Sequence, residues 1–245
     1  MSNKHYNLIN SNINILLKSS EMNCLILLSP CGLGKSTMIL QTMKDKGYTK
    51  DIHFLYRNSF FTPLAFFNVL KETNNLKSKK ILILDDTESL LKNNDIINFL
   101  KSACWKANLM DKRSVFYNTT SKKGKNNKLD FEGKIIMLIN EIPAKNSMLQ
   151  AIIDRSLFVK FEYSNQQILQ LMEKEIIPKN YGSSTYQQRQ KVFKFIRQNC
   201  NKESDLSFRV LIKAFNFFLY SPQNWQEMTL PLLATKQPTN KSNLF

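Results

Sequence analysis

Residues 24–39 read CLILLSPCGLGKSTMI, and the expected architecture follows from this stretch. The five apolar residues 24–28 predict a short buried strand, and the apolar spacing over 35–45 predicts a helix. The loop between them contains Gly32 and Gly34, which permit the positive φ angles that turn successive backbone N–H groups toward a phosphate. The start of the helix adds its positive dipole end. The sequence therefore predicts a phosphate-binding P-loop.

The P-loop pattern G-x-x-x-x-G-K-[ST] is matched except at its first position, where Ser29 replaces glycine. Serine is small enough for that position. Lys35 is expected to place its charge at the β- and γ-phosphates, and the Ser36 hydroxyl is expected to bind Mg²⁺. The cofactors predicted are thus ATP and Mg²⁺. The predicted nucleotide-binding residues are Ser29, Pro30, Cys31, Gly32, Leu33, Gly34, Lys35, Ser36 and Thr37. The alternative is a glycine-rich turn before an ordinary helix.

A second apolar run, residues 81–84, ends in two carboxylates, Asp85 and Asp86. A strand buried on both faces of a sheet is continuously apolar, as this run is. A carboxylate at the end of such a strand is placed to hold Mg²⁺, which makes Asp85 the second predicted metal residue beside Ser36. Asp86, or Glu88 two residues further on, is expected to polarise the attacking water. The alternative is a core strand followed by a helix cap.

Further strands and helices alternate along the first two thirds of the chain. Strands are expected over 51–56, 133–140 and 157–163, and helices over 64–72, 88–108 and 147–154. This alternation implies a parallel sheet covered on both faces. After Ser164 the period is helical throughout, with helices expected over 165–175, 185–199 and 207–220.

The predicted fold class is therefore α/β, with a P-loop αβα sandwich around a parallel five-stranded sheet and a small all-helical lid domain after it. The expected divisions are an N-terminal leader over 1–20, a nucleotide-binding domain over 21–163, a lid domain over 164–230 and a flexible tail over 231–245. A short helix is expected within the leader.

Residues 109–133 break this alternation with a lysine-rich segment. Strand-like residues at 114–119 and a return over 129–132 predict a hairpin with a basic, glycine-containing tip. Lysines there would bind nucleic acid by neutralising its phosphates. The predicted contacts are Lys122, Lys123, Lys125 and Lys128. The alternative is a solvated lysine loop.

The composition gives a net charge of +16. A protein this basic attracts polyanions, of which nucleic acid is the commonest. The alternative is that the abundance of Lys, Asn and Ile reflects an AT-rich genome. The sequence contains no apolar run of roughly 18 residues, no secretory signal and no C-x-x-C pair. We therefore expect a soluble intracellular protein without a membrane span, zinc site or disulfide framework.

The order of these parts resembles that of AAA+ ATPases over roughly residues 20–220, and suggests a replication member of phage, viral or plasmid type. The resemblance implies that Asn140 is the sensor-1 residue between the γ-phosphate and the water. It implies that Arg155 is an arginine finger for a neighbouring subunit and that Arg209, in Ser207-Phe208-Arg209, is the sensor-2 residue of the lid. The predicted catalytic residues are thus Lys35, Asp86, Glu88, Asn140, Arg155 and Arg209.

The resemblance also implies a function and partners. It implies a Mg²⁺-dependent ATPase that acts on DNA as a replication-associated motor or loader, assembled as a ring or spiral homo-oligomer with ATP at subunit interfaces. Replication proteins are further expected partners. Arg155 and Arg209 have plainer explanations as a helix-end residue and a surface residue.

Three alternative functions stay open. The first is a DNA helicase of the viral superfamily-three type, which shares the P-loop and an Asn-ended strand. The second is a nucleotide-switched loader or adaptor with little turnover, because Asp86 stands where many active members have Glu. The third is a protein remodeller that threads a peptide past Phe60 and Phe61, which lie where such proteins often carry pore-loop aromatics and which also suit a core.

Overall fold

The computed structural model describes residues 3–86, 88–106, 112–117, 127–142 and 147–234. Contacts between residues divide the chain into two compact units. The core unit comprises residues 4–30 and 35–161. The helical unit comprises the chain from Glu162 onward together with residues 31–34, the tip of the predicted P-loop, and residues 1–3.

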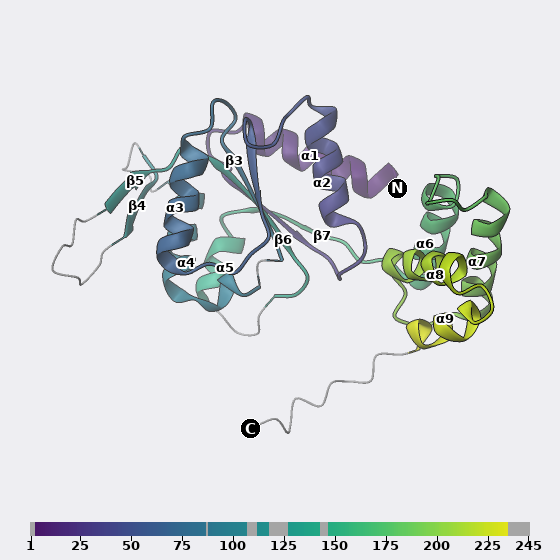
Figure 1. Cartoon of the computed structure of the whole chain (residues 1–245). Helices are drawn as coiled ribbons and strands as arrows, with labels where there is room; N and C mark the ends of the chain where they lie inside the picture. The colour runs from purple at the N-terminus through teal and green to yellow at the C-terminus, as the bar shows by residue number, and fades with distance from the viewer. Residues whose placement is uncertain (1–2, 87, 107–111, 118–126, 143–146, 235–245) are drawn as a thin grey trace, which may run out of the picture. The chain divides into compact units, whose positions relative to one another are not determined.

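The core unit is built on a five-stranded parallel sheet in the order β2-β3-β6-β1-β7 (Figure 1). The strands are β1 (Cys24–Leu28), β2 (Phe54–Arg57), β3 (Ile81–Asp85), β6 (Lys134–Ile139) and β7 (Leu157–Lys160). All residues of β1 and β3 are buried, since a central strand of a parallel sheet is covered on both faces. The predicted α/β class with a parallel five-stranded sheet is confirmed.

Helices cover both faces of this sheet (Figure 1). They are α1 (Asn3–Lys18), α2 (Lys35–Asp45), α3 (Pro63–Asn74), α4 (Asn94–Cys104) and α5 (Ser147–Ile153). Side chains of α3, α4 and α5 share one hydrophobic cluster with alternate residues of β1, namely Cys24, Ile26 and Leu28. Leu25 and Leu27 are also fully buried and point to the opposite face, which α1 and α2 cover (Figure 1).

The segment expected as a leader forms most of α1. Ile9, Ile13 and Leu16 are fully buried, and their spacing places them on one face of the helix. The Tyr6 hydroxyl donates a hydrogen bond of 2.5 Å to Asp45 at the end of α2. The N-terminal helix is therefore packed into the core unit. No helix in the described ranges combines the length and hydropathy needed to cross a bilayer.

The helix expected over 88–108 is shorter than predicted. A 3₁₀ turn, η1 (Leu90–Lys92), comes first, and α4 follows. The cause is Asn93, whose side-chain oxygen accepts backbone N–H groups from the first turn of α4 and so starts a new helix. The strand expected over 51–56 likewise begins only at Phe54.

The hairpin predicted between α4 and β6 is confirmed. Its strands, β4 (Ser114–Tyr117) and β5 (Asn127–Asp130), are antiparallel, with Ser114 opposite Asp130. The tip lysines Lys122, Lys123 and Lys125 lie outside the described residues. Lys128 lies on β5, is exposed, and forms an ion pair of 3.2 Å with Asp130.

The helical unit contains α6 (Asn165–Leu171), a π-helical turn η2 (Met172–Ile176), α7 (Tyr186–Asn199), α8 (Phe208–Tyr220) and α9 (Trp225–Leu233). Ser164 and Thr185 start α6 and α7 through capping boxes, as the S/T-x-x-Q spacing favours. Helix α9 was not predicted, and its Trp225 and Leu233 are buried in the core of this unit. The helix extends into the segment expected as a tail, whose residues 235–245 lie outside the described part.

Candidate nucleotide site

The carboxyl ends of three strands meet at one edge of the core sheet. Strand β6 lies between β1 and β3, and its register pairs Ile139 with Leu28 and Leu138 with Asp85. The residues that follow these strands are therefore neighbours. Ligands of open α/β sheets bind outside this edge. Asn140, directly after β6, thus lies between the start of the P-loop and the acidic end of β3.

Lys35 is the centre of this group. It is 6% exposed, and its ammonium donates hydrogen bonds to the carbonyl of Ser29, to the carbonyl of Pro30 at 3.1 Å and to Oδ1 of Asn140 at 2.8 Å. A buried ammonium is costly unless it is hydrogen-bonded, and these acceptors meet that requirement. Lys35 and Asn140, 105 residues apart in the sequence, are thereby brought together as predicted.

Ser36 and Asp85, the two predicted metal residues, are also in contact. The Ser36 hydroxyl donates a hydrogen bond of 2.6 Å to Oδ2 of Asp85, whose side chain is buried. Within the described ranges, no group of three or more His, Cys, Asp or Glu side chains is arranged for a metal ion. One carboxylate and one hydroxyl suit Mg²⁺, which takes oxygen ligands and binds through few protein groups plus substrate phosphates. These residues therefore fit the predicted cofactor.

Tyr56 is a site residue that the sequence did not reveal. It comes from β2, the strand beside β3, and its hydroxyl donates a hydrogen bond to the same Oδ2 of Asp85. Burial and this hydrogen bond raise the pKa of Tyr56 to about 12, so the phenol stays a neutral donor near neutral pH. In the sequence it is only an aromatic residue in an apolar strand. In the sheet, β2 lies on one side of β3, and β6 and β1 lie on the other. Tyr56 thus helps to fix the Asp85 carboxylate from the side of β3 away from β1, the strand that leads into the P-loop.

We expect Tyr56→Phe to raise the Mg²⁺ concentration for half-maximal binding of a fluorescent ATP analogue by about tenfold, as losses of supporting hydrogen bonds around metal ligands do. The reason is that the Asp85 carboxylate loses one of the two hydroxyl donors that orient it. Tyr48→Phe is the matched control. An unchanged or lower Mg²⁺ midpoint, in a variant with unchanged thermal stability, would contradict this role.

The two candidate acids differ in their contacts. Asp86 accepts hydrogen bonds from the side-chain amides of Asn140 at 3.1 Å and Asn58 at 3.4 Å. Glu88 accepts the backbone N–H of Asn140 at 2.5 Å, and so fixes the end of β6. Asp86 has a φ of 51°, a left-handed conformation that Asp adopts more readily than most residues. The structure brings both acids to Asn140, with only Asp86 bonded to its side chain.

The loop tip packs within the helical unit. Gly32 and Gly34 have φ angles of 76° and 83°, which glycine adopts without strain. A Cβ atom at Gly32 would lie 2.9 Å from Cβ of Ser207 and 3.5 Å from Cγ of Arg209. The Gly32 carbonyl also accepts the N–H of Phe208 at 3.1 Å. The start of α8, with the predicted sensor-2 residue Arg209, therefore contacts the tip of the phosphate loop.

Arg155 lies apart from this group. Its guanidinium donates a hydrogen bond of 2.8 Å to the carbonyl of Ala151 at the end of α5. In the described ranges, no hydrogen bond or ion pair joins it to the residues around Lys35. Its role toward a neighbouring subunit stays a prediction.

Phe60 is 75% exposed, whereas Phe61 packs edge-on against Phe66, with ring centroids 6.1 Å apart.

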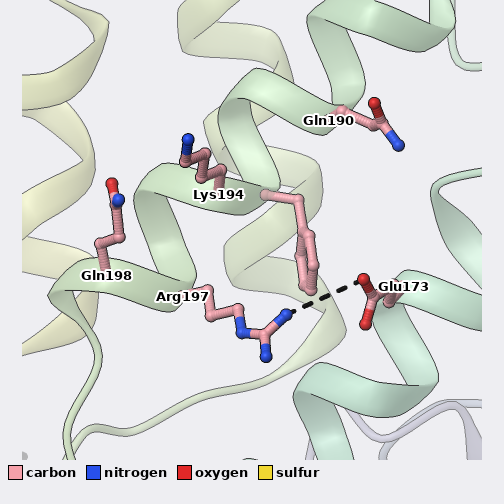
Figure 2. Close-up of a pocket in the computed structure, with 6 residues that line it drawn as sticks. Glu173, Gln190, Lys194, Arg197 and Gln198 are labelled. Atoms are coloured by element: carbon pink, nitrogen blue, oxygen red, sulfur yellow. Dashed lines mark ion pairs between the residues drawn. The ribbon is translucent and has the colours of Figure 1, made fainter.

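A separate pocket of about 550 Å³ lies in the helical unit. Figure 2 shows its lining residues on α7 and η2, with Arg197 and Glu173 facing each other as an ion pair of 3.9 Å. None of the predicted site residues lines it. The pocket is therefore distinct from the candidate nucleotide site.

No protein-family model matches the sequence, and no curated protein matches it. The structure is similar to that of a DNA replication initiation factor, with 13% identity and a TM-score of 0.51 over 93% of this chain and 65% of that chain. It is also similar to Cdc6p from Pyrobaculum aerophilum, with 12% identity and a TM-score of 0.57 over 90% of this chain and 62% of that one.

The chain therefore spans somewhat less than two thirds of the length of these two proteins. At such low identities the likeness establishes the fold alone. That fold is α/β, with a five-stranded parallel sheet followed by C-terminal helices, as the sequence predicted.

Proposed function

We propose that this chain is a Mg²⁺-dependent ATPase that acts on DNA as a replication-associated motor or loader. The observation that carries the proposal is the connected group at the carboxyl edge of the sheet. Lys35 bonds to Asn140, Asn140 bonds to Asp86, and Ser36 bonds to Asp85. These residues were predicted from three separate stretches of the sequence, and an AAA+ fold would bring them together.

The proposal gives each side chain a task. Lys35 and the N–H groups of the loop hold the phosphates, since a fixed positive charge stabilises the charge that spreads over the transferring phosphoryl group. Ser36 and Asp85 would hold Mg²⁺, which neutralises phosphate charge when bound. Asn140 links Lys35 to Asp86, and so places the water-orienting carboxylate next to the phosphate-binding ammonium. Asp86 then orients the attacking water and accepts its proton.

DNA and self-assembly belong to the same proposal. The net charge of +16 and the exposed Lys128 on the hairpin favour binding to a polyanion. The two similar structures are of a DNA replication initiation factor and of Cdc6p, which favours replication among DNA-linked processes. In a ring or spiral, Arg155 at the end of α5 would act on the nucleotide of a neighbouring subunit, and Arg209 would act from the lid.

The test is ATP hydrolysis by the purified chain with and without single-stranded and duplex DNA. We expect turnover to rise at least about threefold with one of these DNAs, because a motor couples hydrolysis to its polymer. Stimulation by an unfolded protein instead of DNA would favour the remodeller. Sedimentation with and without ATP measures the assembly expected from a shared nucleotide site.

A nucleotide-switched loader with little turnover is the second candidate. The observation that favours it is at Asp86, which is one methylene shorter than Glu and has both carboxylate oxygens bonded to amides. A carboxylate whose two oxygens already accept hydrogen bonds has fewer lone pairs free to bind the attacking water. ATP binding without turnover, with or without DNA, would favour the switch.

A further inference from the structure

A pocket of about 390 Å³ lies at the edge of the core sheet opposite the nucleotide site. It is bordered by the amino-terminal end of β6, the base of the β4–β5 hairpin and the residues that follow α4. Its size lies within the range of roughly 300–1,000 Å³ typical of small-ligand sites. Its charged lining residues are Lys106, Lys112, Arg113, Lys134, Asp130 and Glu132.

The two carboxylates of this pocket are already paired. Asp130 forms ion pairs with Lys112 at 3.5 Å and with Lys128 at 3.2 Å. Glu132 pairs with Lys80, which is not among the lining residues. The lining itself therefore carries four cations and two carboxylates, and each carboxylate has a lysine partner. The pocket has an excess of positive charge.

Arg113 is a half-buried part of this excess. Its guanidinium lies 5.3 Å above the ring of Phe131 and donates a hydrogen bond to the carbonyl of Ala103. Among the described residues, no carboxylate lies within 4.0 Å of it. Burial lowers the pKa of Arg113, because a charged guanidinium is disfavoured where water is excluded, while the charges of Cys104 and Glu132 act in the opposite direction.

Lys134 adds a second half-buried cation. Its ammonium donates to the carbonyls of Ser19 at 2.7 Å and Met22 at 2.9 Å and to Oδ1 of Asn23 at 2.7 Å, which fixes its position. Burial, and after it the positive charge of Arg113, lower the pKa of Lys134 to about 8. Two cations that repel each other in a half-buried site would both be stabilised by a bound anion.

We propose that this pocket binds a phosphate group, presented either by a nucleic-acid backbone or by a free phosphate. A guanidinium beside flexible ammonium groups matches the geometry and charge of phosphate oxygens. The exposed Lys128 extends the positive surface from the pocket along the hairpin. This extension favours the nucleic-acid backbone, because successive phosphates would contact successive lysines.

The inference goes beyond the proposed ATPase and does not depend on it. The lining residues follow α4 or lie in the hairpin base and at the start of β6, whereas Lys35, Asp85 and Asn140 lie at the other end of the strands. Failure of ATP hydrolysis would leave the phosphate site untouched. Failure of phosphate binding would likewise leave the nucleotide site untouched.

The test uses the full chain without nucleotide. The double variant Lys106→Gln/Lys112→Gln removes two lysines of the pocket lining that lie between α4 and β4, outside any helix or strand. Anisotropy of a labelled single-stranded oligonucleotide is expected to show affinity about tenfold weaker, and a log–log salt slope smaller by about 1.4, since each contact to single-stranded DNA contributes about 0.7. The control is Lys44→Gln/Lys50→Gln, which removes two exposed lysines elsewhere and should change affinity less than about twofold.

A second arm separates the two sources of phosphate. Inorganic phosphate, against chloride at equal ionic strength, is expected to raise the thermal midpoint of the wild type more than that of Arg113→Lys, which keeps the charge and loses the guanidinium fork. The P-loop is intact in both proteins, so the difference between them reports on this pocket. A smaller phosphate stabilisation in Arg113→Lys, with DNA binding equal in the double variant and its control, supports the site and assigns free phosphate. Equal DNA affinities together with equal phosphate stabilisation of the wild type and Arg113→Lys would overturn the proposal.

Discussion

Replacing Lys35 by Ala is expected to lower ATP hydrolysis by at least about a hundredfold, the loss usual when one preorganised charge-stabilising group is removed. The ammonium is buried and hydrogen-bonded to Asn140 and to two loop carbonyls, so no neighbouring lysine can take its place. Hydrolysis is measured by phosphate release at saturating Mg²⁺, with and without DNA. The matched control is Lys44→Ala, which removes an exposed ammonium from the same helix.

Lys35→Ala also removes the donor that bonds to the carbonyls of Ser29 and Pro30, so stability is measured beside activity. A thermal midpoint close to that of the wild type, with hydrolysis lost, assigns the effect to the site. Hydrolysis within about threefold of the wild type in a folded variant would contradict the proposed nucleotide chemistry. It would also show that any ATPase activity in the preparation comes from another protein.

The parts of the site that the sequence predicted are those encoded by short local patterns. Residues 24–39 contain their strand, loop and helix in one continuous stretch, and residues 81–85 contain an apolar strand and its acidic end. Such strands can be recognised from one sequence because burial on both faces of a sheet permits almost only apolar residues. Asn140 was noted as the polar end of a further buried strand, and its role was implied by the resemblance to AAA+ ATPases.

The parts that the sequence did not reveal depend on which strands become neighbours. Tyr56 reaches Asp85 only because β2 lies beside β3, and its position in β2 carries no chemical signature of its own. Asn58 reaches Asp86 for the same reason. The phosphate pocket joins Arg113 to Lys134 across 21 residues, so composition suggested a basic protein without locating the site.

Two helices differ from the sequence prediction because of single residues, Asn93 at α4 and Pro231 in α9. Asn93 lies within a stretch whose apolar residues have helical spacing, yet its side chain caps the start of α4. The hydrophobic pattern alone does not show whether an Asn side chain will start a new helix or lie within a continuous one. Helix α9 was missed because Pro231 suggests a break, although the helix persists around it and buries Trp225 and Leu233 against the rest of the helical unit. Tertiary packing overrode the local preference there.

Asp86→Asn is expected to reduce turnover by about a hundredfold, the usual contribution of a general base, while ATP binding stays within about threefold of the wild type. The substitution preserves the shape of the side chain and its hydrogen bond from Asn140. It removes the ability to accept a proton and also the acceptor of the long 3.4 Å bond from Asn58. Glu88→Gln is the matched comparison. Its amide oxygen still accepts the backbone N–H of Asn140, so we expect turnover within about fivefold of the wild type.

The pair of variants separates the two acids, and a third variant separates motor from switch. A larger loss in Glu88→Gln than in Asp86→Asn would reverse the assignment and make Asp86 the supporting residue. Asp86→Glu adds the missing methylene at the end of β3. If the wild type binds ATP without turnover and this variant hydrolyses it, the short Asp86 side chain is the reason why the wild type stays ATP-bound. The nucleotide-switched loader would then be the better assignment than the motor. If the wild type already turns over and Asp86→Glu changes the rate little, the carboxylate reaches the water from β3 as it stands.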